Sequence, residues 1–208
     1  MKVTFGSLVI SAGICGILSF AFLATSLGTE YWYIIKMNPM NLSDFEDMSS
    51  HSGLWSINEG GKTYADTIDS FSADPSRYSE TELHMLSMHS AIVLVLPFSL
   101  VLLLFGGICG LVSSLARSPV LLTGTASYFF VCSLLTLCGV SLYIIYSYQA
   151  LAETERLVGQ EGLAHIQISF GWSLGLAWLS YCLELLAGIL LLIAARMARL
   201  QNSSPTVA

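Results

Sequence analysis

Glu184 is the only acidic residue in the apolar stretch 162–195, which makes it the first candidate for chemistry in this chain. An ionisable side chain inside a membrane is costly to bury and is treated as functional by default. One glutamate without a Lys, Arg or His at the same depth cannot line a transport pathway. We therefore predict that Glu184 is protonated or hydrogen-bonded to a Tyr, Ser or Thr of another helix. There it would orient a helix bundle or dock a partner's helix.

The other residues that could bind metals or carry redox chemistry lack the required spacing. His84 and His89 are five residues apart, whereas two ligands on one helical face need a spacing of three or four. None of the five cysteines belongs to a C-x-x-C pair, and they fit as small packing residues in apolar stretches. Glycine-rich phosphate loops, Ser/His/Asp sets and calcium-loop spacing are also absent from the sequence. We predict no enzyme activity, no cofactor and no metal site.

Long uncharged stretches indicate which elements position Glu184. The chain is 54% hydrophobic and only 11% charged, whereas an average soluble domain has about 25% charged residues. About 20 apolar residues in a helix cross the hydrocarbon core of a bilayer. The first stretch could instead be a cleaved signal peptide, but its apolar run is longer than such segments usually have. The sequence predicts four membrane-spanning helices at 6–28, 86–115, 120–147 and 169–195.

The charged residues predict the orientation of these four helices. If both termini are cytoplasmic, the cytoplasmic segments carry four basic residues and no acid: Lys2, Arg117, Arg196 and Arg199. Cytoplasmic loops of membrane proteins carry this excess of Lys and Arg. The sequence therefore predicts a multi-pass membrane protein with a cytoplasmic N-terminus (1–5), turn (116–119) and tail (196–208), and with outer segments at 29–85 and 148–168.

A glycosylation motif distinguishes the two faces of the membrane in this topology. The sequon Asn41-Leu42-Ser43 lies in the first outer segment, so we predict a glycoprotein modified at Asn41. A second sequon begins at Asn202, on the predicted cytoplasmic side, and should stay unmodified.

The first outer segment is too long to be a simple connection between two helices. Connections in helix bundles usually have about 2–8 residues, whereas this one exceeds 50, so we predict a small antiparallel sheet. The segments "EYWYII" (30–35) and "HIQISF" (165–170) have the alternation and β-branched content of strands. Within the helices, two small-residue pairs predict close packing inside the bundle or contacts between copies of the chain: Gly106 with Gly110, and Gly171 with Gly175.

Trp32 and the triplet Gly53-Leu54-Trp55, in a chain with four spans and a long first outer segment, carry a family resemblance. This pattern resembles the superfamily of claudins, peripheral myelin protein, epithelial membrane proteins and calcium-channel gamma subunits. Five longer stretches are similar to the branch of transmembrane proteins 114 and 235: "GTEYWYII", "SSHSGLW", "LPFSLVLLLFGGICGLVSSLA", "TLCGVSLYIIYS" and "ISFGWSLGLAW". The resemblance implies a membrane α-helical fold, a four-transmembrane-helix bundle capped by a small extracellular antiparallel β-sheet.

The sequence departs from the superfamily at the disulfide of the first outer loop. The resemblance implies two cysteines after the triplet, but Asn58 stands at the first position and the second falls near Tyr64. We therefore expect no disulfide, and we expect strand pairing and burial of Trp55 to hold this loop. Loss of the disulfide would remove a few kcal/mol from the stability of the outer sheet.

The resemblance also implies that the protein resides in the plasma membrane and acts through contacts rather than catalysis. The leading interpretation is an auxiliary or regulatory subunit of a channel or another integral membrane protein complex, embedded in the lipid bilayer. The alternative is a claudin-like cell-contact component. No nucleic-acid partner is predicted, homo-oligomers stay open, and a transporter is disfavoured because Glu184 is the only charged residue within the spans.

Overall fold

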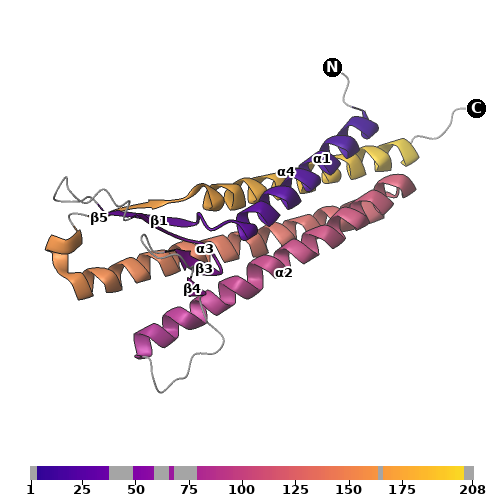
Figure 1. Cartoon of the computed structure of the whole chain (residues 1–208). Coiled ribbons are helices and arrows are strands. Elements are labelled where there is room, and N and C mark those ends of the chain that lie inside the picture. Colours follow the sequence, from indigo (N-terminus) through magenta and orange to yellow (C-terminus); the bar gives the residue numbers. More distant parts are fainter. Residues whose placement is uncertain (1–3, 38–48, 59–65, 68–78, 164–165, 204–208) are drawn as a thin grey trace, which may run out of the picture. The chain divides into compact units, whose positions relative to one another are not determined.

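A computed structural model describes residues 4–37, 49–58, 66–67, 79–163 and 166–203 of this chain. The chain forms two compact units, which we call the helical unit and the sheet unit. The helical unit comprises Met1–Ala24, Pro97–Leu137 and Ala177–Ala208, and the sheet unit comprises Thr25–Leu96 and Cys138–Leu176. Four long helices contribute residues to both units: α1 (Phe5–Gly28), α2 (Glu80–Ala116), α3 (Pro119–Leu163) and α4 (Trp172–Ser203) (Figure 1).

Each of the four helices is long and apolar enough to cross a membrane. In their most apolar windows at most 39% of the residues are buried within the protein, so most apolar side chains lie on its surface. Ile17 is 72% exposed and Leu115 is 77% exposed, for example. Soluble proteins rarely display apolar surfaces of this extent. The exposed apolar faces therefore require lipid as their solvent.

The helical unit has a core made from all four helices. Small residues let the helices approach closely, and aliphatic and aromatic side chains fill the remaining space. The buried members are Ala12 of α1, Leu103 of α2, Leu122, Ala126 and Phe129 of α3, and Ala187, Leu191, Ala195 and Ala198 of α4.

The described residues of the sheet unit form five short strands in the order β4-β3-β2-β1-β5, and every neighbouring pair is antiparallel. Figure 1 labels β1, β3, β4 and β5. The strands are β1 (Tyr33–Met37), β2 (Ser49–Ser52), β3 (Ser56–Asn58), β4 (Asp66–Thr67) and β5 (Ile166–Phe170). β1 pairs with β2 on one side and with β5 on the other, with Tyr33 opposite Phe170. The prediction of a strand within 165–170 is confirmed, as is the fold class of four apolar helices with an antiparallel sheet.

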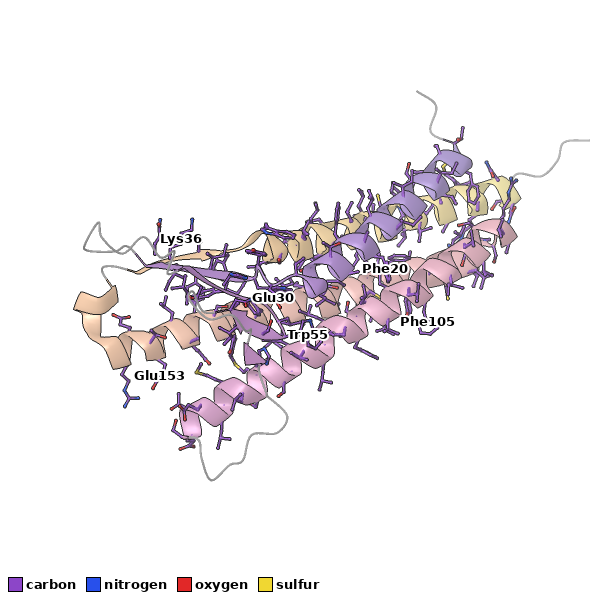
Figure 2. The ribbon with its side chains drawn as sticks, viewed as in Figure 1. Phe20, Glu30, Lys36, Trp55, Phe105 and Glu153 are labelled. Carbon is purple, nitrogen blue, oxygen red and sulfur yellow. The ribbon has the colours of Figure 1, made fainter. Side chains whose placement is uncertain are left out.

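Three helices extend beyond the predicted spans, and one of them is α4, which ends at Ser203 rather than at 195. α2 begins at Glu80, where Ser79 and Glu82 exchange backbone-to-side-chain hydrogen bonds of 2.7 and 3.4 Å in a capping box. α3 continues to Leu163 with a break at Gly159, whose φ is 78°, so residues 148–158 of the predicted second outer segment are helical. The pair Glu153–Arg156 lies at 3.8 Å on this polar extension (Figure 2). Helix bounds do not locate the bilayer, so the membrane and loop boundaries stay predictions.

Candidate functional site

The last turn of α1 is capped by side chains of the sheet unit. A helix leaves its last four carbonyls without intrahelical partners, and these groups need other donors. The indole nitrogen of Trp32 donates to the Ser26 carbonyl at 2.8 Å. That of Trp55, which is labelled in Figure 2, donates to the Leu27 carbonyl at 2.8 Å. The Thr29 hydroxyl donates to the Thr25 carbonyl at 2.8 Å. The two motif tryptophans therefore act together as a C-terminal cap.

Trp32, rather than Trp55, is the buried tryptophan of the motif. Its ring is fully buried and lies 4.7 Å from the ring of Tyr143. Trp55 is 45% exposed, so the expectation that its burial holds the loop is wrong. The cause is geometric, because the indole must reach the Leu27 carbonyl at the end of α1 while Leu54 occupies the interior position beside it.

Gly53 and Leu54 of the same motif make backbone contacts that other residues would disturb. A Cβ atom on Gly53 would lie 2.7 Å from the Glu30 Cα atom, so the backbone requires glycine at this close approach. Leu54 is fully buried, and its carbonyl accepts a 2.9 Å hydrogen bond from Nε2 of the buried His89. Since a carbonyl only accepts, Nε2 carries a hydrogen in this pair. His89 thus fixes the motif to α2.

Asn58, at the position where the resemblance implies a cysteine, belongs to a polar cluster. The Glu30 carboxylate accepts hydrogen bonds of 2.5 Å from the Ser56 hydroxyl and from the Asn58 amide nitrogen. The same Asn58 nitrogen lies 3.2 Å from Nε2 of His51. Hydrogen bonds to a charged group are stronger than neutral ones, about 1.5–3 kcal/mol each. This cluster links the end of α1 to strands β2 and β3. Tyr64 lies outside the described residues.

Gly171 lies between β5 and α4 rather than inside a helix. Its N–H donates to the Trp32 carbonyl at 3.0 Å, and a Cβ atom here would lie 1.8 Å from the Tyr31 carbonyl oxygen. Gly175, four residues later in α4, has no atom within 4 Å of a Cβ built there. The predicted small-residue pair is therefore divided, because Gly171 serves strand-to-helix contact and Gly175 borders open space.

Four exposed aromatic side chains of the sheet unit form two pairs, which together we call the aromatic surface. Its members are Tyr31, Tyr148, Phe170 and Trp172, each between 40% and 61% exposed. The rings of Tyr31 and Trp172 are 5.9 Å apart, and those of Tyr148 and Phe170 are 6.2 Å apart. Aromatic side chains of this kind are enriched in protein interfaces and at membrane surfaces.

Glu184 is fully buried in the helical unit among hydroxyl groups. Thr136 of α3 lies 3.1 and 3.2 Å from its two carboxyl oxygens, and Ser180 and Ser19 lie 3.3 and 3.4 Å from Oε1. The expected hydroxyl partners on other helices are thus present. Each hydroxyl carries one hydrogen, and each also reaches a backbone carbonyl: Cys132 for Thr136, Ser19 for Ser180, and Ser180 for Ser19. The carboxyl group joins α1, α3 and α4 in one network.

The other predicted small-residue pair, Gly106 with Gly110, lies where α2 contacts α3 in the helical unit. A Cβ atom on Gly106 would approach the Tyr128 ring to 2.9 Å, and one on Gly110 would lie 3.7 Å from the Thr125 methyl group. The Tyr128 hydroxyl donates to the Leu102 carbonyl at 2.7 Å, which fixes this ring against α2. Gly106 therefore lets the Tyr128 ring lie directly on the backbone of α2.

The remaining predictions concern metal binding, the cysteines and glycosylation. No group of three His, Cys, Asp or Glu residues that could hold a metal ion occurs in the described part of the chain. All five cysteines are free; Cys109, Cys138 and Cys182 are exposed, whereas only Cys132 is buried. Most are therefore not the interior packing residues that the sequence suggested. Asn41 lies outside the described residues.

Sequence reasoning missed His89, Glu30 and the capping role of the tryptophans. His89 lies near the start of the apolar part of α2, and a buried polar group must have a partner, which was a usable signal. Its partner, Leu54, is 35 residues away and no spacing rule connects the two. Glu30 offered no comparable signal, because it was one of many acids in the first outer segment.

Comparison with known protein families gives one match. The sequence profile of a family described as PMP-22/EMP/MP20/claudin tight junction matches residues 17–193, from the middle of α1 to the last third of α4. The matched range contains the capping tryptophans, the sheet and Glu184.

Proposed function

This chain belongs to the PMP-22/EMP/MP20/claudin family, and from that premise we propose that it is an auxiliary subunit of a channel or another membrane complex. It is a multi-pass membrane protein with four apolar helices. In the proposal it is non-enzymatic, resides in the plasma membrane with both termini in the cytoplasm, and acts through protein contacts. Within the family we place it nearest to transmembrane proteins 114 and 235, on the stretches they share with this sequence.

The aromatic surface is the observation that carries this proposal. Tyr31, Tyr148, Phe170 and Trp172 are exposed. Phe170 ends β5, which pairs with β1, and Trp172 begins α4, while Tyr148 lies within α3 and Tyr31 between α1 and β1. Rigid aromatic groups lose little conformational freedom on binding and dominate the binding energy of many interfaces. A partner with its own extramembrane domain would bury these rings. The polar cluster around Glu30 supports the proposal, because it orders the sheet that presents them.

The test is crosslinking followed by affinity purification from membranes of an expressing tissue. The variants are Phe170→Ser on the aromatic surface and Phe98→Ser on α2, which is also exposed but lies in the helical unit. We expect an integral membrane partner with the wild type and with Phe98→Ser, and much less of it with Phe170→Ser. If the wild type and both variants recover the same amount of partner, the aromatic surface is not the binding surface. If the wild type recovers no membrane partner, the proposed function is overturned.

A cell-contact role is the second candidate, because the matching family is described as a tight-junction family. In this alternative the sheet unit contacts another copy or a related chain on a neighbouring cell. Mixed cultures of expressing and non-expressing cells separate the two roles. Enrichment only where two expressing cells meet supports the cell-contact role, whereas uniform surface staining supports the auxiliary subunit.

A further inference from the structure

An apolar groove runs along α1 and α2 in the helical unit. It has a volume of about 440 Å³ and extends from Val9 and Ser114 at one end to Phe20 and Leu103 at the other (Figure 2 labels Phe20). Two glycines from each helix line it: Gly13 and Gly16 of α1, and Gly107 and Gly110 of α2. Because these residues have no side chains, the helix backbones form much of its wall.

The groove offers little polar surface to water. Ser114 is the only lining residue with a polar side chain, and its hydroxyl already donates to the Gly110 carbonyl at 2.6 Å. Apolar spaces of this kind stay dry, and an empty one forfeits dispersion contacts along its whole lining. An apolar occupant from the bilayer therefore fits the groove.

A basic side chain stands at one end of the groove. Arg117 follows Ser114 by less than one helical turn, and its backbone N–H donates to the Ser114 carbonyl at 3.4 Å. Its guanidinium lies 5.9 Å from the centre of the Phe5 ring, one turn of α1 before Val9. Arg117 has a φ of 48°, the left-handed conformation that often ends a helix, so the chain turns there. The side chain is exposed, and no carboxylate pairs with it among the described residues.

The charges of the helical unit favour a negatively charged ligand. Its described part contains Arg117, Arg196 and Arg199 as basic residues, while Glu184 is its only acid and is fully buried. Arginine binds phosphate through several parallel hydrogen bonds. A lipid phosphate in the leaflet that contains Arg117 can therefore meet this side chain while its acyl chain enters the groove.

We propose that the α1–α2 groove binds an anionic phospholipid, with one acyl chain between the glycines of the two helices and the phosphate on Arg117. A partner's transmembrane helix is the competing occupant. The position of Arg117 favours the lipid, because an apolar helix in the groove would need no cation at its end. The groove belongs to the helical unit and the aromatic surface to the sheet unit. A result against one proposal therefore does not count against the other.

The first test uses the wild-type protein in nanodiscs that contain phosphatidylserine with a photoreactive group on its acyl chain. We expect the crosslinked peptides to fall within residues 9–20 and 103–114, which line the groove. The same probe on phosphatidylcholine should label these peptides less. Labelling spread evenly over the outward faces of all four helices would overturn the proposal.

The second test measures lipid retained by purified variants in native mass spectrometry. Gly13→Leu and Gly107→Leu fill the groove, and a Cβ atom at either position meets nothing within 4 Å. Gly124→Leu is the matched control, since Gly124 has the same freedom but does not line the groove. We expect both groove variants to lose bound phosphatidylserine and the control to keep it.

The headgroup contact is tested in the same measurement. Arg117→Gln should lower retained phosphatidylserine about fivefold, the factor that corresponds to the ~1 kcal/mol contributed by one basic residue near an anionic membrane surface. Arg199→Gln serves as the control because Arg199 is an exposed arginine of α4. Unchanged retention in all variants would overturn the site. Loss of a co-purified membrane protein with unchanged lipid would assign the groove to a helix instead.

Discussion

The indole nitrogen of Trp55 donates to the backbone carbonyl of Leu27 across 2.8 Å, so a residue of the sheet unit completes the last turn of α1. We expect Trp55→Phe to lower the free energy of unfolding by about 1 kcal/mol, the net value of one hydrogen bond. Thermal unfolding in detergent measures this loss. Trp178→Phe is the control, because the Trp178 indole has no acceptor among the described residues. Equal melting temperatures for the two variants would exclude a capping role.

Gly171→Ala should disrupt the junction between β5 and α4. The added methyl group would lie 1.8 Å from the Tyr31 carbonyl oxygen, a distance that forces the backbone to move. Gly175→Ala adds the same group where nothing lies within 4 Å. We expect surface expression to fall sharply for the first variant and to stay unchanged for the second. Similar losses in both would favour the helix-packing pair predicted from the sequence.

His89→Leu should destabilise the protein more than His84→Leu. The first change leaves the carbonyl of the buried Leu54 without its 2.9 Å donor, which costs about 1–3 kcal/mol for a buried polar group. His84 is exposed on the same helix, so its replacement removes no buried donor. Chemical unfolding of both variants, followed by tryptophan fluorescence, gives the comparison. A smaller effect at His89 than at His84 would contradict this assignment.

Glu184→Gln should keep the fold, whereas Glu184→Leu should weaken it. Glutamine preserves an oxygen that accepts from Thr136, Ser180 or Ser19, but leucine removes the acceptor from the whole network. The loss for leucine should be small, about 0.6 kcal/mol for each membrane hydrogen bond, because every hydroxyl can turn to a backbone carbonyl. The refolding yield in lipid, measured for Glu184→Gln and for Glu184→Leu, gives the comparison. If Glu184→Gln folds normally but loses a partner, Glu184 has a functional role beyond the bundle.

The predicted orientation of the chain can be tested with its two sequons. A glycosidase should shift the wild-type band on a gel, and Asn41→Gln should remove that shift. Asn202→Gln should leave the shift in place, since Asn202 lies near the end of α4 on the side predicted to be cytoplasmic. The reverse pattern would invert the proposed topology.

The four helices and strands β1 and β5 could be predicted because their signals are local. About 20 consecutive residues without a charge are enough to predict a membrane span. The pattern Ser-x-x-Glu, here Ser79 and Glu82, is enough to predict the start of a helix. The polar part of α3 was missed for the same reason. Glu153 and Arg156 fit a helix surface as well as they fit a loop, and only the structure shows which is formed.

The site depended on contacts between distant residues, which local patterns do not contain. Gly106 with Gly110 and Gly171 with Gly175 have the same spacing in the sequence. One pair faces Tyr128 and Thr125, whereas the first member of the other pair meets the backbone of Tyr31. Likewise, the family resemblance identified Trp32 and Trp55 as important, but not that both donate to the end of α1.

The pairing of β1 with β5 has a consequence for how the protein is made. Tyr33 lies opposite Phe170, so β1 meets this neighbour only after α2 and α3 have been synthesised. Until then one edge of β1 has unpaired backbone groups, the kind of edge that recruits other strands. A ribosome that stalls before Ile166 would release a chain with this edge open. An unfinished chain therefore differs from the complete protein by an open strand edge, even when three helices are already in the membrane.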